Sequence, residues 1–217
     1  MLSKYLGKNK TKKCKYQSID SSFIYNNQCR EKLNRNTYYK GKKGIKISTI
    51  VDSNGIPLSI LLLNGNESDI VTLIRTYQNI QIQTNSSKYT DHNRYKQYIL
   101  ADKWYYLKNN IDYIDSIGCI PIIAVNNRNT KDMNKIKCMS VEHKKIYKKR
   151  IIVENFFMKI KKYPKINIIY EKTIKSYNGL LLFVVLHLIG NHLWFWNEDL
   201  LYFLNFNICG NYTQFLY

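Results

Sequence analysis

Three acidic residues, Asp20, Asp102 and Glu154, are of the type and in the settings that suit a metal-dependent active site. Asp20 lies inside an apolar stretch typical of a β-strand, and Asp102 ends another such stretch. Open α/β sheets bind ligands beyond the ends of their strands, so carboxylates at these positions can converge on one crevice. Asp also ends strands as an ordinary turn residue, and for either residue alone that interpretation is the stronger one.

The segment around Glu154 has the periodicity of a helix with three distinct faces. Tyr147, Arg150, Glu154 and Lys161 fall within about 60° of one another at ~100° per residue. An apolar face about 120° away contains Ile152, Val153, Phe156, Phe157 and Ile160. A third face holds Lys148, Lys159 and Lys162. The mixed stripe suits a metal-binding carboxylate beside cations that grip phosphate, while periodicity alone leaves an ordinary charged stripe open.

The charge balance indicates a polyanionic partner. The 217 residues include 34 Lys and Arg against 15 Asp and Glu, a formal net charge of +19. A folded domain with this excess is attracted to nucleic acid first and to an anionic membrane surface second. Codon bias in AT-rich coding sequence is the competing explanation, because Lys, Asn, Ile and Tyr all look enriched.

Alternating strand and helix patterns predict an α/β domain with a mixed sheet. The expected strands are 16–25, 44–51, 56–63, 98–101 and 120–125, and the expected helices are 70–80, 105–117, 144–162 and 179–196. Residues 1–15 are predicted to be a basic tail, residues 16–196 the catalytic domain and residues 197–217 a C-terminal extension. Residues 26–42, rich in Asn and Lys, are expected to form a loop.

The apolar run at 179–196 is long enough to be considered as a membrane span. His187, Asn191 and His192 are costly in lipid, which favours a buried helix of a soluble fold and leaves a membrane segment as the alternative. The basic N-terminus has no apolar segment typical of a secretory signal.

Cysteine and histidine usage argues against a disulfide framework and a zinc site. The five cysteines are odd in number, widely spaced and without a C-x-x-C pair, so we expect reduced intracellular thiols. The four histidines form no H-E-x-x-H pair.

The helix stripe is also a family signature. Tyr147, Arg150, Glu154 and Lys161 reproduce the Y-x2-R-x3-E-x6-K spacing of a large group of insertion-sequence DDE transposases, which the chain resembles over roughly residues 16–195. The other matching segments, in order, are IDSS (19–22), the KGIK…VDSNGIPL hairpin (43–58), N-x-x-D (66–69), ADKWYY (101–106), IPIIAVNNRN (120–129) and VENFFMKIKKY (153–163). Several motifs in the same order make chance a poor explanation.

The resemblance implies an α/β fold with a ribonuclease-H-like mixed sheet flanked by helices. It implies that Asp20, Asp102 and Glu154 are catalytic and hold two Mg²⁺ (or Mn²⁺) ions, and that the domain cleaves and joins DNA strands. Arg150 and Lys161 would contact DNA phosphates.

Aromatic residues near the acids are further expected DNA contacts. Tyr147 would stack on or hydrogen-bond DNA. Trp104 stands where the family usually has Gly, and Tyr106 where it usually has Asp. Trp104 would crowd the site or stack on a base. Asp69 is interpreted as a surface acid rather than as a carboxylate that supports the metal ligands.

The expected partner is double-stranded DNA, at transposon ends and target, bound by a homodimer, with no membrane association and with an intracellular, DNA-associated location. Only 19 residues precede Asp20, whereas the family usually carries a further N-terminal segment, so we expect a shortened or isolated catalytic domain. The alternatives are a nuclease of the same fold that cuts without joining, a domesticated DNA-binding protein without activity, and a basic membrane-associated protein.

Overall fold

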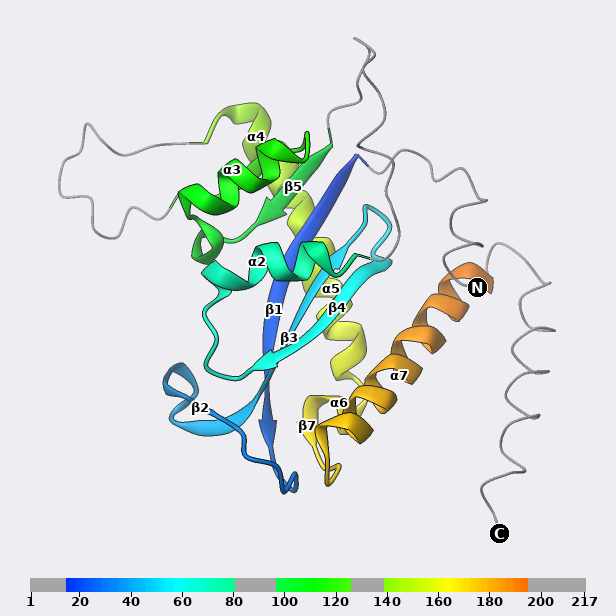
Figure 1. Ribbon diagram of the computed structural model, residues 1–217. Helices are drawn as coiled ribbons and strands as arrows, with labels where there is room; N and C mark the ends of the chain where they lie inside the picture. Colours follow the sequence, from blue (N-terminus) through cyan, green and yellow to red (C-terminus); the bar gives the residue numbers. More distant parts are fainter. Residues whose placement is uncertain (1–14, 81–96, 126–138, 195–217) are drawn as a thin grey trace.

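The computed structural model describes residues 15–80, 97–125 and 139–194, and these build a seven-stranded mixed sheet with helices on both faces (Figure 1). The strands are β1 (Tyr16–Asn26), β2 (Arg35–Asn36), β3 (Lys42–Val51), β4 (Pro57–Asn64), β5 (Tyr98–Ala101), β6 (Ile120–Ile123) and β7 (Ile168–Ile169). The α-helices are α2 (Asp69–Gln78), α3 (Lys108–Ser116), α4 (Val141–Tyr147), α5 (Ile151–Lys161), α6 (Pro164–Asn167) and α7 (Ile174–Trp194). Short 3-10 turns are η1 (Thr37–Tyr39), η2 (Lys103–Tyr105) and η4 (Lys148–Arg150).

The long strand β1 is the centre of the sheet. It pairs antiparallel with β3, which pairs antiparallel with β4, and it pairs parallel with β5, which pairs parallel with β6. The resulting order is β4-β3-β1-β5-β6, with β3 antiparallel to the central strand. The predicted α/β class, with a mixed sheet flanked by helices, is confirmed.

The hairpin between β3 and β4 follows from its turn residues. One carboxylate oxygen of Asp52 accepts hydrogen bonds from the main-chain N–H groups of Asn54 and Ile56, each 2.8 Å long. Gly55 has φ of 81°, a conformation that glycine adopts without steric cost. The D-S-N-G signal therefore fixes the register that buries the apolar face of β3.

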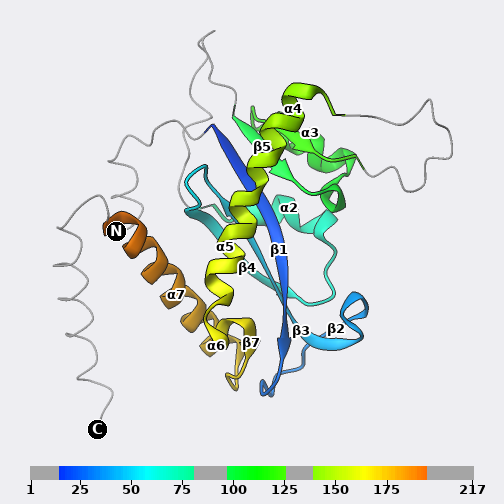
Figure 2. The ribbon, with the colours of Figure 1, turned by 180° about the vertical axis from the view of Figure 1, so that it is seen from behind.

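The two faces of the sheet support separate cores because successive side chains of a strand point to opposite sides. Ile19 of β1 packs with Leu73 of α2 and Ile114 of α3 on one face. Ile24 of β1 packs with Phe156 of α5 on the other. Figure 2 shows α5 crossing over β1 on this second face. The sheet thus presents alternate residues of β1 to two different helical layers.

Three predicted helices differ clearly from the structure, and one of them, predicted at 179–196, begins already at Ile174. The helix expected at 105–117 begins only at Lys108, because Asp102 caps the η2 turn by accepting a 2.7 Å hydrogen bond from the Lys103 N–H. The single helix expected at 144–162 is divided into α4 and α5 by the η4 turn. Pro164 does end this helical segment, and it begins α6.

The last apolar run forms α7, which is only partly buried. Tyr177, Leu181 and Val185 join the core on the α5 face, whereas Leu182 and Phe183 are exposed. The buried-helix prediction therefore holds for one side of α7. By length and composition alone, Ile174–Asn191 is also apolar enough to cross a membrane. The predicted tail and C-terminal extension lie outside the described residues, apart from Lys15.

Candidate active site

The register of β1 and β5 places Asp20 and Asp102 side by side at one edge of the sheet. The two strands are parallel, and their last paired residues are Ser18 and Leu100. Asp20 and Asp102 each come two residues further along. The two acids therefore lie at the same level, where the pairing of β1 with β5 ends and ligands of open sheets bind.

Glu154 reaches this edge from α5. Val153, Phe156 and Phe157 are buried against the sheet, so the neighbouring Glu154 lies at the border between protein and solvent, with its side chain 47% exposed. Glu154 is in the first turn of α5, where a carboxylate is favoured by the helix dipole. The apolar face of α5 thus sets the position of its acid.

Arg150 bridges two of the three carboxylates. Its Nη1 donates a 3.1 Å hydrogen bond to Oδ2 of Asp20, and its Nη2 donates to Oε1 of Glu154. The Arg150 side chain is 17% exposed, so this ion pair is shielded from water on most sides. The spacing R-x3-E makes the second contact an i,i+4 pair, and the first one spans 130 residues. Arg150 therefore links the Glu154 carboxylate of α5 to the Asp20 carboxylate of β1.

The charges of this cluster act on one another. Burial raises the pKa of Asp20 above its ordinary value of 3.8, although the Ser21 N–H and the Arg150 guanidinium oppose the change. Burial disfavours the charged form of Arg150 and is the largest single effect, but Asp20, Tyr147 and the other two acids together outweigh it, and the pKa of Arg150 is raised. Asp102 contributes to the same increase in the pKa of Arg150, so all three acids lie within electrostatic reach of this cation.

An open pocket of about 570 Å³ lies beside the bridge. Asp20, Glu154 and Lys161 line it, together with Ser21, Ser22, Phe157, Met158 and Lys162. Burial lowers the pKa of Lys161, with Asp20 opposing the change. The structure therefore brings four of the predicted residues together. Asp20, Glu154 and Lys161 line the pocket, and Arg150 contacts both of these acids.

The remaining predicted residues lie around this group. The Tyr147 ring is 5.9 Å from the Arg150 guanidinium, and burial raises the pKa of Tyr147. Asp102 and Trp104 are not among the residues that line the pocket. Trp104 is 39% exposed in the η2 turn directly after Asp102, with the Lys103 ammonium 5.8 Å from its ring.

The three carboxylates supply hard oxygen ligands, the type that Mg²⁺ prefers. Asp20 and Glu154 already share one cation, so their donor atoms fit a shared ion. Within residues 15–80, 97–125 and 139–194, no three Asp, Glu, His or Cys side chains are close enough to hold one ion together. In this conformation the Arg150 guanidinium takes the place between the acids.

The chain matches the family model of the transposase DDE domain over residues 16–188. It belongs to the transposase DDE domain family. The matched region contains all three acids and every residue of the helix stripe, in agreement with the predicted recognition. No individual curated protein matches the sequence.

Two solved structures are similar to this transposase domain. One is piggyBac transposase in a synaptic complex with hairpin DNA, at 11% identity and a TM-score of 0.45, covering 79% of this chain and 44% of that one. The other is the catalytic domain of Mos1 mariner transposase, at 12% identity and a TM-score of 0.36, covering 72% of this chain and 81% of that one. The chain thus spans less than half of the piggyBac chain.

A second polar cluster of the transposase domain lies behind Asp20, on the opposite face of β1. Asp69 accepts hydrogen bonds from the Ser21 hydroxyl and, at 2.9 Å, from the Lys46 ammonium. Lys46 also donates to the main-chain carbonyl of Glu67 at 2.7 Å. The interpretation of Asp69 as a surface acid was wrong, since its side chain is only 25% exposed and is paired.

This cluster connects to the candidate site through one residue. The Ser21 N–H donates a 2.8 Å hydrogen bond to Oδ1 of Asp20, while the Ser21 side chain points the other way to Asp69. The sequence did contain a signal for it. Lys46 lies in the middle of a strand whose neighbours are buried, and a buried ammonium needs an acidic partner.

Proposed function

We propose that this transposase domain cleaves DNA phosphodiester bonds and joins the freed 3′ ends to target DNA, using Asp20, Asp102 and Glu154 to hold two divalent ions, Mg²⁺ or Mn²⁺. The observation that carries the proposal is the convergence of Asp20 and Glu154, from a strand and a helix far apart in the sequence, on one cation beside an open pocket. Asp102 follows β5 at the same height as Asp20 in the neighbouring parallel strand, which supports including it among the acids that hold the ions. The partner is double-stranded DNA, bound by a homodimer inside the cell.

The divalent ions would activate water or a 3′-hydroxyl and stabilise the leaving oxygen. The Arg150 guanidinium now contacts one oxygen of Asp20 and one of Glu154, so it would have to move before an ion could bind between those two oxygens. Arg150 then has donors available for a phosphate, which a guanidinium binds in bidentate geometry. The divalent ions would thus replace the Arg150 guanidinium between the acids, and Arg150 would then act on DNA.

Other residues of the pocket would position the DNA. Lys161 lines the pocket and stays within the field of Asp20, so its ammonium is placed to bind the phosphate that enters. Tyr147 packs against Arg150 and would contact the sugar or base next to that phosphate. Trp104 extends the same edge of the sheet beyond Asp102 and would stack on a base.

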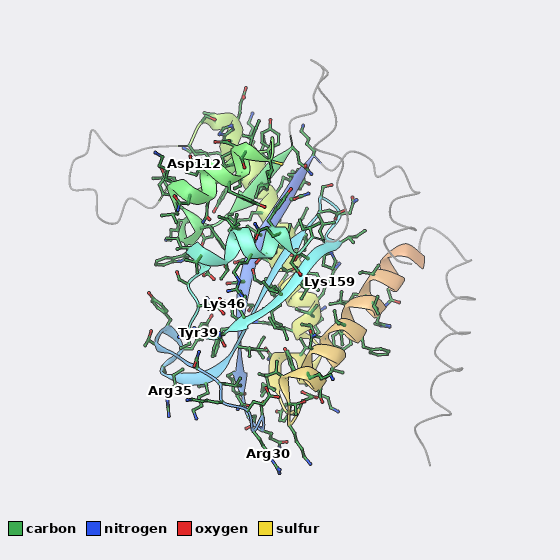
Figure 3. All side chains as sticks on the ribbon, in the orientation of Figure 1. Arg30, Arg35, Tyr39, Lys46, Asp112 and Lys159 are labelled. Atoms are coloured by element: carbon green, nitrogen blue, oxygen red, sulfur yellow. The ribbon has the colours of Figure 1, made fainter. Side chains whose placement is uncertain are left out.

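The test is cleavage and strand transfer of a labelled DNA duplex by the full chain in Mg²⁺ or Mn²⁺. We expect Asp20→Asn, Asp102→Asn and Glu154→Gln each to abolish both reactions while DNA binding continues. Asp112→Asn is the matched control, since Asp112 is an exposed acid of α3 on another part of the surface (Figure 3). Cleavage without joining would identify a nuclease, and binding without cleavage by the unmodified chain would identify an inactive DNA-binding relative.

A further inference from the structure

A basic loop far from the acids has no role in the proposed chemistry. We call residues 30–43, which include β2 and η1, the tyrosine loop. Its six exposed cations are Arg30, Lys32, Arg35, Lys40, Lys42 and Lys43. Its single acid, Glu31, is directed away, because its carboxylate accepts a 3.0 Å hydrogen bond from the Ile174 N–H. None of the ion pairs found among the described residues includes a cation of this loop.

The conformation of the tyrosine loop is fixed by its own hydrogen bonds. Asn36 is buried; its side chain accepts a 2.9 Å bond from the Tyr38 N–H and donates to the Gly65 carbonyl. The Gly41 N–H donates to the Asn36 carbonyl, and Arg35 donates to the Gly41 carbonyl. Lys40 and Gly41 have φ of 54° and 68°, so the chain reverses direction there. A loop held in this way loses little entropy on binding a partner.

Two adjacent tyrosines of the loop are both exposed but differ in their ring contacts. The Tyr39 ring stacks on Phe23, with the ring centroids 4.5 Å apart, and so anchors the loop to β1. The Tyr38 ring is 88% exposed although its main chain is held by Asn36. Figure 3 shows Arg30, Arg35 and Tyr39 together at the end of the molecule near β2. The loop therefore presents a bare aromatic ring among cations on a fixed backbone.

This combination matches the chemistry of DNA. Cations without acidic partners bind phosphates and release counterions, and an exposed aromatic ring offers a flat face on which a base stacks. A surface tyrosine alone is ordinary. An anionic protein would offer negative charge to the lysines but no base that stacks on the Tyr38 ring, so nucleic acid is the better match.

We propose that the tyrosine loop is a second DNA-binding surface, in which Tyr38 stacks on an unpaired base and the surrounding cations hold the adjacent phosphates. The inference rests on the proposed function for its partner, the DNA that the acids cut. Tyr25, at the loop end of β1, is five residues beyond Asp20, or about 17 Å at ~3.3 Å per residue. That length equals about five base steps. Phe23, on which Tyr39 stacks, lies on the face of β1 opposite Asp20, so the loop would contact flanking DNA that passes around the end of β1.

The experiment is fluorescence anisotropy of the full chain with a blunt duplex and with the same duplex carrying a single-stranded 3′ tail, in EDTA so that no cleavage occurs. We expect Tyr38→Ala to weaken binding of the tailed DNA about tenfold and to change binding of the blunt duplex little. Tyr38→Phe keeps the ring and should bind as the unmodified chain does. Thermal melting will show that these changes at an exposed side chain leave the fold intact.

The charge part of the proposal is tested by the salt dependence of binding. Lys43→Ala should reduce the slope of log affinity against log salt by about 0.9, the value for one lost phosphate contact on duplex DNA. Lys159→Ala is the matched control, since Lys159 is an exposed lysine of α5 on another side of the molecule (Figure 3).

The outcomes separate this inference from the proposed function. If Tyr38→Ala and Lys43→Ala bind both DNAs like the unmodified chain, the tyrosine loop is not a DNA surface, even where the acids are needed for cleavage. If the loop variants lose affinity but the unmodified chain cuts nothing, the loop proposal stands and the catalytic one fails. If the unmodified chain binds no DNA, both fail.

Discussion

Replacing Lys46 with Met should destabilise the domain strongly. Met has a similar length but no charge, so Asp69 would keep only the Ser21 hydroxyl as a partner. Removing one member of a buried ion pair costs about 3–5 kcal/mol, because the other charge stays buried without compensation. The Asp69 side chain is 25% exposed and water can reach part of it, which favours the lower end, about 3 kcal/mol. For a chain of this size the melting temperature should fall by about 6–12 °C.

The assay is thermal unfolding followed by circular dichroism, with a matched ion pair as control. Arg75 pairs with Glu67, whose side chain is 18% exposed, but the Arg75 side chain is 55% exposed and Glu67 also keeps a 2.8 Å hydrogen bond from the Asn64 N–H. Arg75→Met should therefore change the free energy of unfolding by less than about 1 kcal/mol. The destabilisation of the double variant Lys46→Met/Asp69→Leu should be smaller than the sum of the two single destabilisations by more than about 1 kcal/mol, as expected for contacting residues. Additive effects, or a melting temperature for Lys46→Met equal to that of Arg75→Met, would refute the buried-pair argument.

Four further outcomes follow from the geometry. Asp69→Asn should reduce DNA cleavage about ten- to a hundredfold with unchanged DNA affinity, because it weakens the hydrogen bond to Ser21, whose N–H holds the Asp20 carboxylate. Cleavage assays measure the first quantity and anisotropy the second. Relative to Asp20→Asn, the unmodified chain should gain stability as the pH falls through the raised pKa of Asp20 towards 3.8, because burial disfavours the charged carboxylate; melting curves at several pH values measure this difference. Gly44→Ala should cost about 1–3 kcal/mol, as its Cβ would lie 2.1 Å from a main-chain oxygen of β1, whereas Gly179→Ala, in open space on a helix, should be stabilising; melting curves compare them. Ile160→Ala should lower the free energy of unfolding in urea by about 2–5 kcal/mol, because Ile160 is fully buried.

Sequence patterns predicted the elements whose causes are local. The D-S-N-G turn and the period of two in the flanking residues placed the β3–β4 hairpin, and the short apolar run at Tyr98–Ala101 placed β5 with its bounds correct. Asp20 and Asp102 were located by the same patterns. These features depend on hydrogen bonds and side-chain alternation within a few residues, which a sequence displays directly.

Features that depend on distant partners were not predictable in this way. The η4 turn divides α4 from α5 although its residues, Lys148–Arg150, are all good helix formers. Asp69 was misjudged because its partners, Ser21 and Lys46, lie 48 and 23 residues away in the chain. The exposure of Tyr38 beside the stacked Tyr39 is likewise decided by contacts with Asn36 and Phe23 rather than by composition.

The bridge formed by Arg150 explains how such a site can exist before any ion binds. Carboxylates held near one another repel, and burial already raises the pKa of Asp20. A guanidinium that contacts Asp20 and Glu154 at once offsets this repulsion and keeps the strand and helix in register. Lysine would do this less well, because its single ammonium nitrogen lacks the planar fork in which two terminal nitrogens each take one carboxylate. On the proposed mechanism, the R-x3-E spacing therefore serves two states: it assembles the acids without metal, and it leaves a phosphate-binding cation beside them when metal arrives.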